Sequence, residues 1–252
     1  MNQSEELNKL VDICHSNLKN SKKCLKYLVD ERLLTKESIV NNKIGFFPQN
    51  PGILTKYVSE ELLNKLNILN YSKGSDFSDY FFLVFPIYSE YNKPIGISGR
   101  TLLDDYDRSL LSIPKYKNSS YKKSNVLYGL NFSNQHILDS DNAYVVEGYF
   151  DQLSMCKNNL LNSVAICGTA FSQGHFLKLA RYTNRITFIL DSDDAGIKSA
   201  QRIYSKYINR GLKLRFLKVP ESYKDIDEYF SDPEKNKNTF FKDFKQIIPE
   251  TW

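Results

Sequence analysis

The sequence predicts an α/β protein in two parts: an α+β part over residues 1–140, and a parallel sheet with helices on both faces over residues 141–252. Two observations predict this class. In the first part, helical periodicity surrounds two β-rich runs. In the second part, short apolar runs alternate with amphipathic segments, as in parallel sheets whose strands are connected by helices.

Composition excludes several classes of protein. Hydrophobic residues make up 41% and charged residues 25% of the chain, which is typical of globular rather than disordered proteins. The longest apolar stretch, residues 80–88, is interrupted by Pro86 and is shorter than the about 20 residues that a membrane helix needs. The N-terminus is polar and lacks a secretory signal, so we expect no membrane association and a cytoplasmic location.

The first part begins with apolar residues at helical spacing over residues 4–34, which predict two helices with a break near Asn20. Two shorter helices are expected over residues 35–40 and 55–66. The β-rich runs over residues 80–88 and 94–103 flank a turn and predict an antiparallel hairpin.

The second part is expected to contain four strands and three helices. The strands are predicted over residues 143–147, 163–167, 185–190 and 212–219, and the helices over residues 150–158, 173–182 and 195–210. A polar loop is expected over residues 232–239, followed by one last short helix in the tail.

The four cysteines, at positions 14, 24, 156 and 167, form neither a disulfide framework nor a C-x2-C pair, so we expect reduced thiols and no zinc. Cys14, His15 and Cys24 present an alternative as three metal ligands. A helical surface pair with one core cysteine is the favoured interpretation.

Acidic residues follow three of the predicted strands: Glu147 after the first, Asp191 and Asp193 after the third, and Asp225 and Asp227 after the fourth. The carboxyl ends of parallel strands meet at one edge of a sheet, where α/β proteins bind ligands. In extended chain, each Asp-x-Asp pair aims both side chains the same way. Dense carboxylates need a cation, and hard oxygen ligands select Mg²⁺ or Mn²⁺. Alternatively, these acids only cap helix starts.

Seven segments carry a resemblance to a known family. VVEGYFD (145–151), CGTA (167–170) and DSDDAG (191–196) resemble the motifs of a Toprim domain. Earlier in the chain, KIGFFP (43–48), residues 85–103, PKYKNS (114–119) and LYGL (127–130) resemble, in the same order, the N-terminal part of the RNA-polymerase domain of DnaG-type primases. The resemblance implies a DNA primase, which makes short RNA primers for replication from NTPs on a single-stranded DNA template by nucleotidyl transfer.

The resemblance also implies roles for the acidic residues. Glu147, Asp191 and Asp193 would serve two or more metal ions, Asp225 and Asp227 match a later family pair, and Asp151 would line the same pocket. Glu147 has an alternative role as a proton shuttle, because a carboxylate among acids has a raised pKa.

A basic surface for template and nucleotide phosphates is the second implied site. Matching positions are Arg100, Lys115, Asn118 and Lys123, with Arg32 matching less closely because Leu33 stands where the family usually has Gly. Tyr116, Tyr121 and Tyr128 lie between them and are candidates for base stacking, whereas Lys117 and Lys122 are interpreted as solvated. The three histidines, at positions 15, 136 and 175, lie in no family motif and are expected to be structural or on the surface.

Two departures from the family pattern bear on partners. The zinc ribbon of DnaG-type primases has no counterpart here, and only about 25 residues follow Asp227, where the family has a helicase-binding region. The chain is therefore either a fragment or the partner of a separate zinc-ribbon protein or replicative helicase. A compact primase fits a phage or mobile element, in a bacterial cytoplasm or an infected host.

Two alternative functions remain open from the sequence. A Toprim nuclease would use the same acids to hydrolyse DNA or RNA, but it has no need of the first-part motifs. A non-enzymatic DNA-binding subunit would have broken acidic motifs, and here they are intact.

Overall fold

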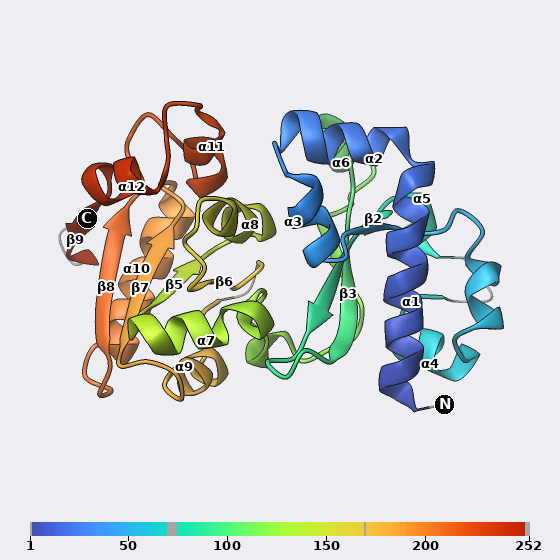
Figure 1. Ribbon diagram of the computed structural model, residues 1–252, viewed down its shortest axis with the longest axis horizontal. Helices are drawn as coiled ribbons and strands as arrows, with labels where there is room; N and C mark the ends of the chain where they lie inside the picture. Colours follow the sequence, from blue (N-terminus) through green and yellow to red (C-terminus); the bar gives the residue numbers. More distant parts are fainter. Residues whose placement is uncertain (1, 70–74, 169, 250–252) are drawn as a thin grey trace. The chain divides into compact units, whose positions relative to one another are not determined.

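The computed structural model describes residues 2–69, 75–168 and 170–249, which form two compact units (Figure 1). The first unit is Met1–Ser89 with Lys93–Tyr121, and the second is Glu90–Asn92 with Lys122–Trp252. The units therefore divide at residues 121 and 122, whereas the sequence placed the division near residue 140. The physical reason is helix α7 (Leu130–Ser140), which buries Leu130 and Ile137 in the core of the second unit.

The first unit contains a four-stranded antiparallel sheet in the order β1-β2-β3-β4. Its strands are β1 (Gly45–Phe46), β2 (Leu83–Tyr88), β3 (Pro94–Arg100) and β4 (Tyr116–Asn118). Its helices are α1 (Gln3–Asn17), α2 (Lys22–Lys26), α3 (Lys36–Asn41), α4 (Glu60–Lys65), α5 (Asp76–Asp79) and α6 (Asp105–Leu110), with 3-10 turns at Leu18–Asn20 and Pro51–Lys56 and a π-helical turn at Tyr27–Glu31.

The predicted hairpin is confirmed as β2 and β3, and the predicted helix break near Asn20 is confirmed as the 3-10 turn. The helix expected over residues 55–66 begins only at Glu60. There the Ser59 hydroxyl accepts the backbone N–H of Leu62 and caps α4.

One face of α1 forms the centre of the first unit's core. Leu7, Leu10, Val11 and Cys14 are buried on it, at the spacing of successive helical turns. Helix α1 packs so closely on β1 that a Cβ at Gly45 would lie 2.6 Å from the carbonyl carbon of Cys14. This approach requires glycine at position 45.

Gly45→Ala is therefore expected to lower the free energy of unfolding by about 1–3 kcal/mol, because the added methyl group meets backbone that cannot turn away. Urea unfolding followed by circular dichroism measures the effect. The control is Gly52→Ala, since Gly52 is exposed and its nearest neighbour is the side chain of Asn50. Equal stability of the two variants would contradict the close contact.

The second unit contains a five-stranded sheet in the order β6-β5-β7-β8-β9, parallel except for the β8–β9 pair. Its strands are β5 (Ala143–Val146), β6 (Ser163–Ala165), β7 (Arg185–Leu190), β8 (Lys213–Lys218) and β9 (Lys245–Ile247). Besides α7, its helices are α8 (Tyr149–Lys157), α9 (Gln173–Leu179), α10 (Asp194–Tyr207), α11 (Ile226–Ser231) and α12 (Lys237–Asp243), with a 3-10 turn at Lys123–Asn125.

The four predicted strands and three predicted helices of this part are confirmed, with small shifts at their ends. Strand β7 is buried at every position from Ile186 to Leu190. Continuous burial of a parallel strand means that both faces of the sheet are covered, as predicted. In Figure 1, β5, β7 and β8 lie side by side.

The tail follows its prediction with a shifted boundary. The expected loop is confirmed over residues 232–236, and the expected short helix is α12, which begins earlier than expected because the Asn236 side chain caps it and Phe240 is buried against Phe230 and Phe244. Strand β9, which pairs with β8, was not predicted. Residues 250–252 lie outside the described part of the chain.

Within the described residues, no helix has the length and apolar character needed to cross a bilayer.

Candidate active site

Two of the predicted acids, Glu147 and Asp191, meet at the centre of the second sheet's carboxyl edge. Glu147 directly follows β5 and Asp191 directly follows β7, and these strands are parallel neighbours. The Oε1 atom of Glu147 accepts the backbone N–H of Asp191 at 3.0 Å. Both residues are half-buried. The sheet register thus brings residues 145–151 and 191–196, the first and third of the motifs that resemble a Toprim domain, into direct contact.

Asp151 and Asp227 form a second, more deeply buried pair. Asp151 lies in the first turn of α8, where its Oδ2 accepts the N–H of Gly148 at 2.8 Å. Its Oδ1 accepts the N–H of Asp227 at 3.2 Å, and Asp227 Oδ1 accepts the hydroxyl of Ser154 at 2.6 Å. Asp151 therefore joins the starts of helices α8 and α11. Ser154 is a member of this network that sequence reasoning missed, since a serine inside a helix carries no distinct signal.

Asp193 and Asp225 are helix caps. The Oδ1 atom of Asp193 accepts the N–H of Gly196 at 2.8 Å at the start of α10, and Asp225 Oδ1 accepts the N–H of Glu228 at 2.8 Å at the start of α11. The assumption that each Asp-x-Asp pair lies in extended chain is wrong for Asp225 and Asp227, because Asp227 lies inside the first turn of α11. The capping interpretation holds for these two caps and does not account for Glu147 or Asp191.

The acids perturb one another strongly. Burial, together with the carboxylates of Glu147, Asp151, Asp225 and Asp193, raises the pKa of Asp191 to about 8. Burial, with Asp225 and Asp227 next in effect, raises the pKa of Asp151 to about 7. Burial is the main cause of the raised pKa of Glu147, whereas the hydrogen bond from the backbone N–H of Asp191 lowers this pKa. A bound cation relieves this repulsion.

The donors fit a hard divalent cation, because they are all carboxylate oxygens. In the described residues, however, no three His, Cys, Asp or Glu side chains converge closely enough to hold one ion together. Of the alternative metal ligands, Cys14 is buried in the core of the first unit, and His15 Nδ1 lies 2.8 Å from the carbonyl oxygen of Ile44.

Two of the predicted basic residues, Arg100 and Arg32, share one aromatic ring in the first unit. The guanidinium of Arg100 lies 5.2 Å from the ring centroid of Tyr27 and 5.0 Å from the ring centroid of Tyr116. The hydroxyl of Tyr116 also accepts the Nη1–H of Arg100 at 2.6 Å. Arg32 Nε donates to the Tyr27 hydroxyl at 2.8 Å. Tyr27 was not predicted, because it lies in an ordinary helical pattern outside the matched motifs, although it precedes Arg32 by only five residues.

Two more basic-surface candidates, Lys115 and Asn118, lie beside Arg100 in the first unit, because β4 pairs with the Arg100 end of β3 and the carbonyl oxygen of Lys115 accepts the backbone N–H of Thr101 at 3.2 Å. Lys115 is exposed, and Asn118 Oδ1 accepts the hydroxyl of Tyr121 at 2.7 Å. Lys123 is exposed and belongs to the second unit, where its carbonyl oxygen lies 3.0 Å from Nε2 of buried His175. Lys117, interpreted as solvated, forms an ion pair with Asp76.

Tyr128 is wrongly predicted as a base-stacking residue. It is only 7% exposed, and its ring packs edge-on against Tyr149 with 4.8 Å between the centroids.

Comparison with known proteins places this geometry in a family. Residues 13–134 match the model described as "DNA primase catalytic core, N-terminal domain", and residues 144–230 match the model described as "Toprim-like". The chain belongs to the DnaG-type primase family. The two matches lie in the family's order and correspond to its catalytic core.

Individual DNA primases are similar to this chain in sequence and in structure. The DNA primase of Aquifex aeolicus (strain VF5) is 30% identical over 199 residues, which cover 75% of this chain and 38% of that protein. The chain thus spans about two fifths of that relative's length. The crystal structure of the zinc-binding and RNA polymerase domains of the Aquifex aeolicus primase matches with a TM-score of 0.83 at 26% identity, covering 98% of this chain and 63% of that chain. A DnaG primase catalytic domain bound to single-stranded DNA matches with a TM-score of 0.77 at 25% identity, covering 95% and 79% of the two chains.

The raised pKa values predict how stability depends on pH. Without a metal ion, an aspartate whose pKa is raised from about 3.9 in the unfolded chain stabilises the fold at low pH. That stability is lost as pH rises from about 4 to about 8 for Asp191. Asp191→Asn should therefore flatten the decline of the unfolding free energy over this range. The backbone N–H that binds Glu147 is kept in this variant.

The measurement is urea unfolding in EDTA at several pH values. Asp139→Asn, which removes an exposed carboxylate from α7, is the control and should keep the wild-type slope. An unchanged slope in Asp191→Asn would show that this carboxyl is not perturbed in the folded protein.

Proposed function

We propose that this chain is the RNA-polymerase part of a DNA primase and joins ribonucleotides into short RNA primers on single-stranded DNA. One observation carries the proposal. A Toprim-like unit with paired carboxylates at its strand ends follows, in one chain, a unit that matches the primase-specific N-terminal domain. The single-stranded DNA bound to the similar DnaG catalytic domain supports the choice of template.

The acidic site is proposed to hold Mg²⁺ or Mn²⁺, in two or more ions, through Glu147, Asp191 and Asp193 with Asp225 and Asp227. Bound there, the ions would stabilise the attacking 3′-oxygen and the leaving pyrophosphate. The buried Asp151 acts as a positioning residue, because it holds the backbone of Gly148 beside Glu147 and the backbone of Asp227.

The basic residues are proposed to bind phosphates of the template and of the incoming nucleotides. The guanidinium of Arg100 is oriented by two tyrosine rings, and Arg32 shares one of them. Arginine makes bidentate contacts with phosphate, and an oriented guanidinium loses less freedom when it binds. Lys115 and Asn118 of the first unit, and Lys123 of the second, would each add a phosphate contact.

Asp191→Asn should abolish primer synthesis, because it removes a metal-binding charge without changing the size of the side chain. The assay combines single-stranded DNA, NTPs with labelled ATP and GTP, and Mg²⁺ or Mn²⁺, and follows short labelled RNA on a gel. Asp139→Asn is the control and should retain wild-type synthesis.

Retained synthesis in Asp191→Asn would overturn the site assignment. Metal-dependent degradation of the DNA or RNA, without synthesis, would identify the chain as a Toprim nuclease instead.

Lys115→Gln should weaken binding of single-stranded DNA and reduce the slope of log Kobs against log salt by about 0.7, the value for one lost phosphate contact. Fluorescence anisotropy from low to moderate salt measures both quantities. Lys65→Gln, an exposed lysine on α4, is the control for the change in net charge. An identical slope in the two variants would remove Lys115 from the proposed surface.

A further inference from the structure

Helix α10 and the start of β8 carry an unusual concentration of positive charge. Residues 195–220 include seven Lys and Arg residues and no Asp or Glu. Because the whole chain has a net charge of +5, the rest of it sums to 5 − 7 = −2. This segment therefore holds more positive charge than the protein's net value. Apart from Lys218, its basic residues are Lys198, Arg202, Lys206, Arg210, Lys213 and Arg215.

Geometry arranges these charges in a row. Gly196, Ala200, Ile203 and Tyr207 form the buried face of α10. Lys198, Arg202 and Lys206 follow one another at intervals of four residues and are all exposed. Four residues span about 6 Å along a helix, so the charges form a regularly spaced stripe along α10, which we call the α10 stripe. Arg210, four residues further on, continues the spacing just beyond the helix.

The α10 stripe is not neutralised within its own unit. Lys218 pairs with Glu221, whereas none of the other six basic residues has an ion pair with a carboxylate of the described residues. Like charges four residues apart on a helix repel and destabilise it. The helix macrodipole favours a cation only in the last turn, which accounts for Lys206 and not for Lys198 or Arg202. Folding alone therefore gives no reason for this arrangement.

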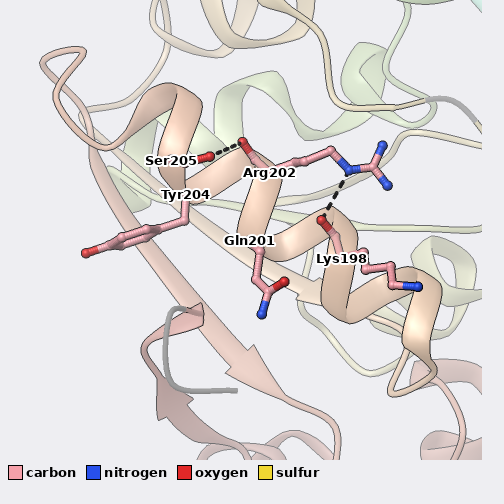
Figure 2. A pocket seen from close by; sticks show the side chains of 5 residues that line it. All are labelled: Lys198, Gln201, Arg202, Tyr204 and Ser205. Atoms are coloured by element: carbon pink, nitrogen blue, oxygen red, sulfur yellow. Dashed lines mark hydrogen bonds between the residues drawn. The ribbon is translucent and has the colours of Figure 1, made fainter.

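A hollow on the α10 stripe indicates the chemistry of the partner. The hollow has a volume of about 540 Å³, and it is lined by Lys198, Gln201, Arg202, Tyr204 and Ser205. Figure 2 shows these five side chains. The ring of Tyr204 packs against Phe216, and its hydroxyl points away from the helix. All five residue types contact phosphate and sugar in protein–nucleic acid complexes. An acidic protein segment is the alternative partner, but the side chains that line the hollow among the described residues all carry hydrogen-bond donors of the kind that phosphate and sugar oxygens accept from.

We propose that the α10 stripe binds the phosphodiester backbone of DNA, independently of base sequence and separately from the acidic site. Asp193 of the acidic site caps the start of α10, and the stripe runs along the helix away from that cap. The choice of DNA as the bound polyanion rests on the proposed function. The affinity for a phosphate backbone is instead inferred from the exposed positive charges of the α10 stripe.

The test is binding of a fluorescent single-stranded DNA oligonucleotide by the full chain, followed by anisotropy over a range of salt. The triple variant Lys198→Gln, Arg202→Gln, Lys206→Gln should weaken binding on the order of tenfold and reduce the salt slope by about 2, for three lost phosphate contacts. The charge-matched control is Lys65→Gln, Lys93→Gln, Lys242→Gln, which removes three exposed lysines from other elements and should bind as the wild type does.

A second variant distinguishes the loss of positive charge from a loss of the fold. Lys198→Arg, Arg202→Lys, Lys206→Arg keeps all three charges and should bind within about twofold of the wild type. If both triple variants of the α10 stripe bind as the control does, the proposal is overturned. If the glutamine variant keeps DNA binding but loses binding of a polyglutamate peptide, the stripe serves an acidic protein and the proposal is also overturned.

The outcome is separable from that of the proposed function. Stripe-dependent DNA binding without primer synthesis would support the stripe and contradict the primase assignment. Primer synthesis that depends on Asp191, with wild-type binding by the glutamine variant, would do the reverse.

Discussion

The structure of the second unit depends on keeping several carboxylates close together at one end of a buried sheet. Repulsion and burial both oppose this arrangement, and both raise the pKa values of Asp191 and Asp151. Hydrogen bonds from backbone N–H groups to the carboxylates stabilise the arrangement. The carboxylate of Glu147 accepts a backbone N–H from the residue after β7, and that of Asp151 accepts backbone N–H groups at the starts of two helices. Asp193 and Asp225 each cap a helix by accepting a backbone N–H of its first turn. These four carboxylates are thereby held in place by main chain, which is fixed by the sheet and the helices, whereas the carboxylate of Asp227 accepts the hydroxyl of Ser154.

The same dependence on main chain explains why the acidic site could be predicted from the sequence. Glu147 and Asp191 directly follow apolar runs that become adjacent strands, so their proximity follows from local pattern and from the geometry of parallel sheets. The position of Asp227 could not be derived in the same way. It depends on α11 packing against α8, a contact between segments 76 residues apart that no local pattern encodes.

The less predictable parts of the fold are short elements whose form is decided by tertiary contacts. Strand β9 has three residues and exists because β8 offers an edge, and α12 depends on an aromatic cluster around Phe240. Helix α7 was assigned to the wrong unit because its apolar face does not reveal which core it joins. In the Arg32–Tyr27–Arg100 cluster, the resemblance to the family's motifs predicted the two arginines but not Tyr27, whose ring both guanidinium groups contact.

Asp193 and Asp225 are helix caps, and the metal-binding role proposed for them would be a second use of the same side chains. Asparagine and serine cap helices about as well as aspartate does, but they carry no charge. A related chain that no longer needs the proposed metal site could therefore exchange these two aspartates and still fold. Under that proposal, the capping residues at the starts of α10 and α11 would distinguish, from sequence alone, active relatives from inactive ones.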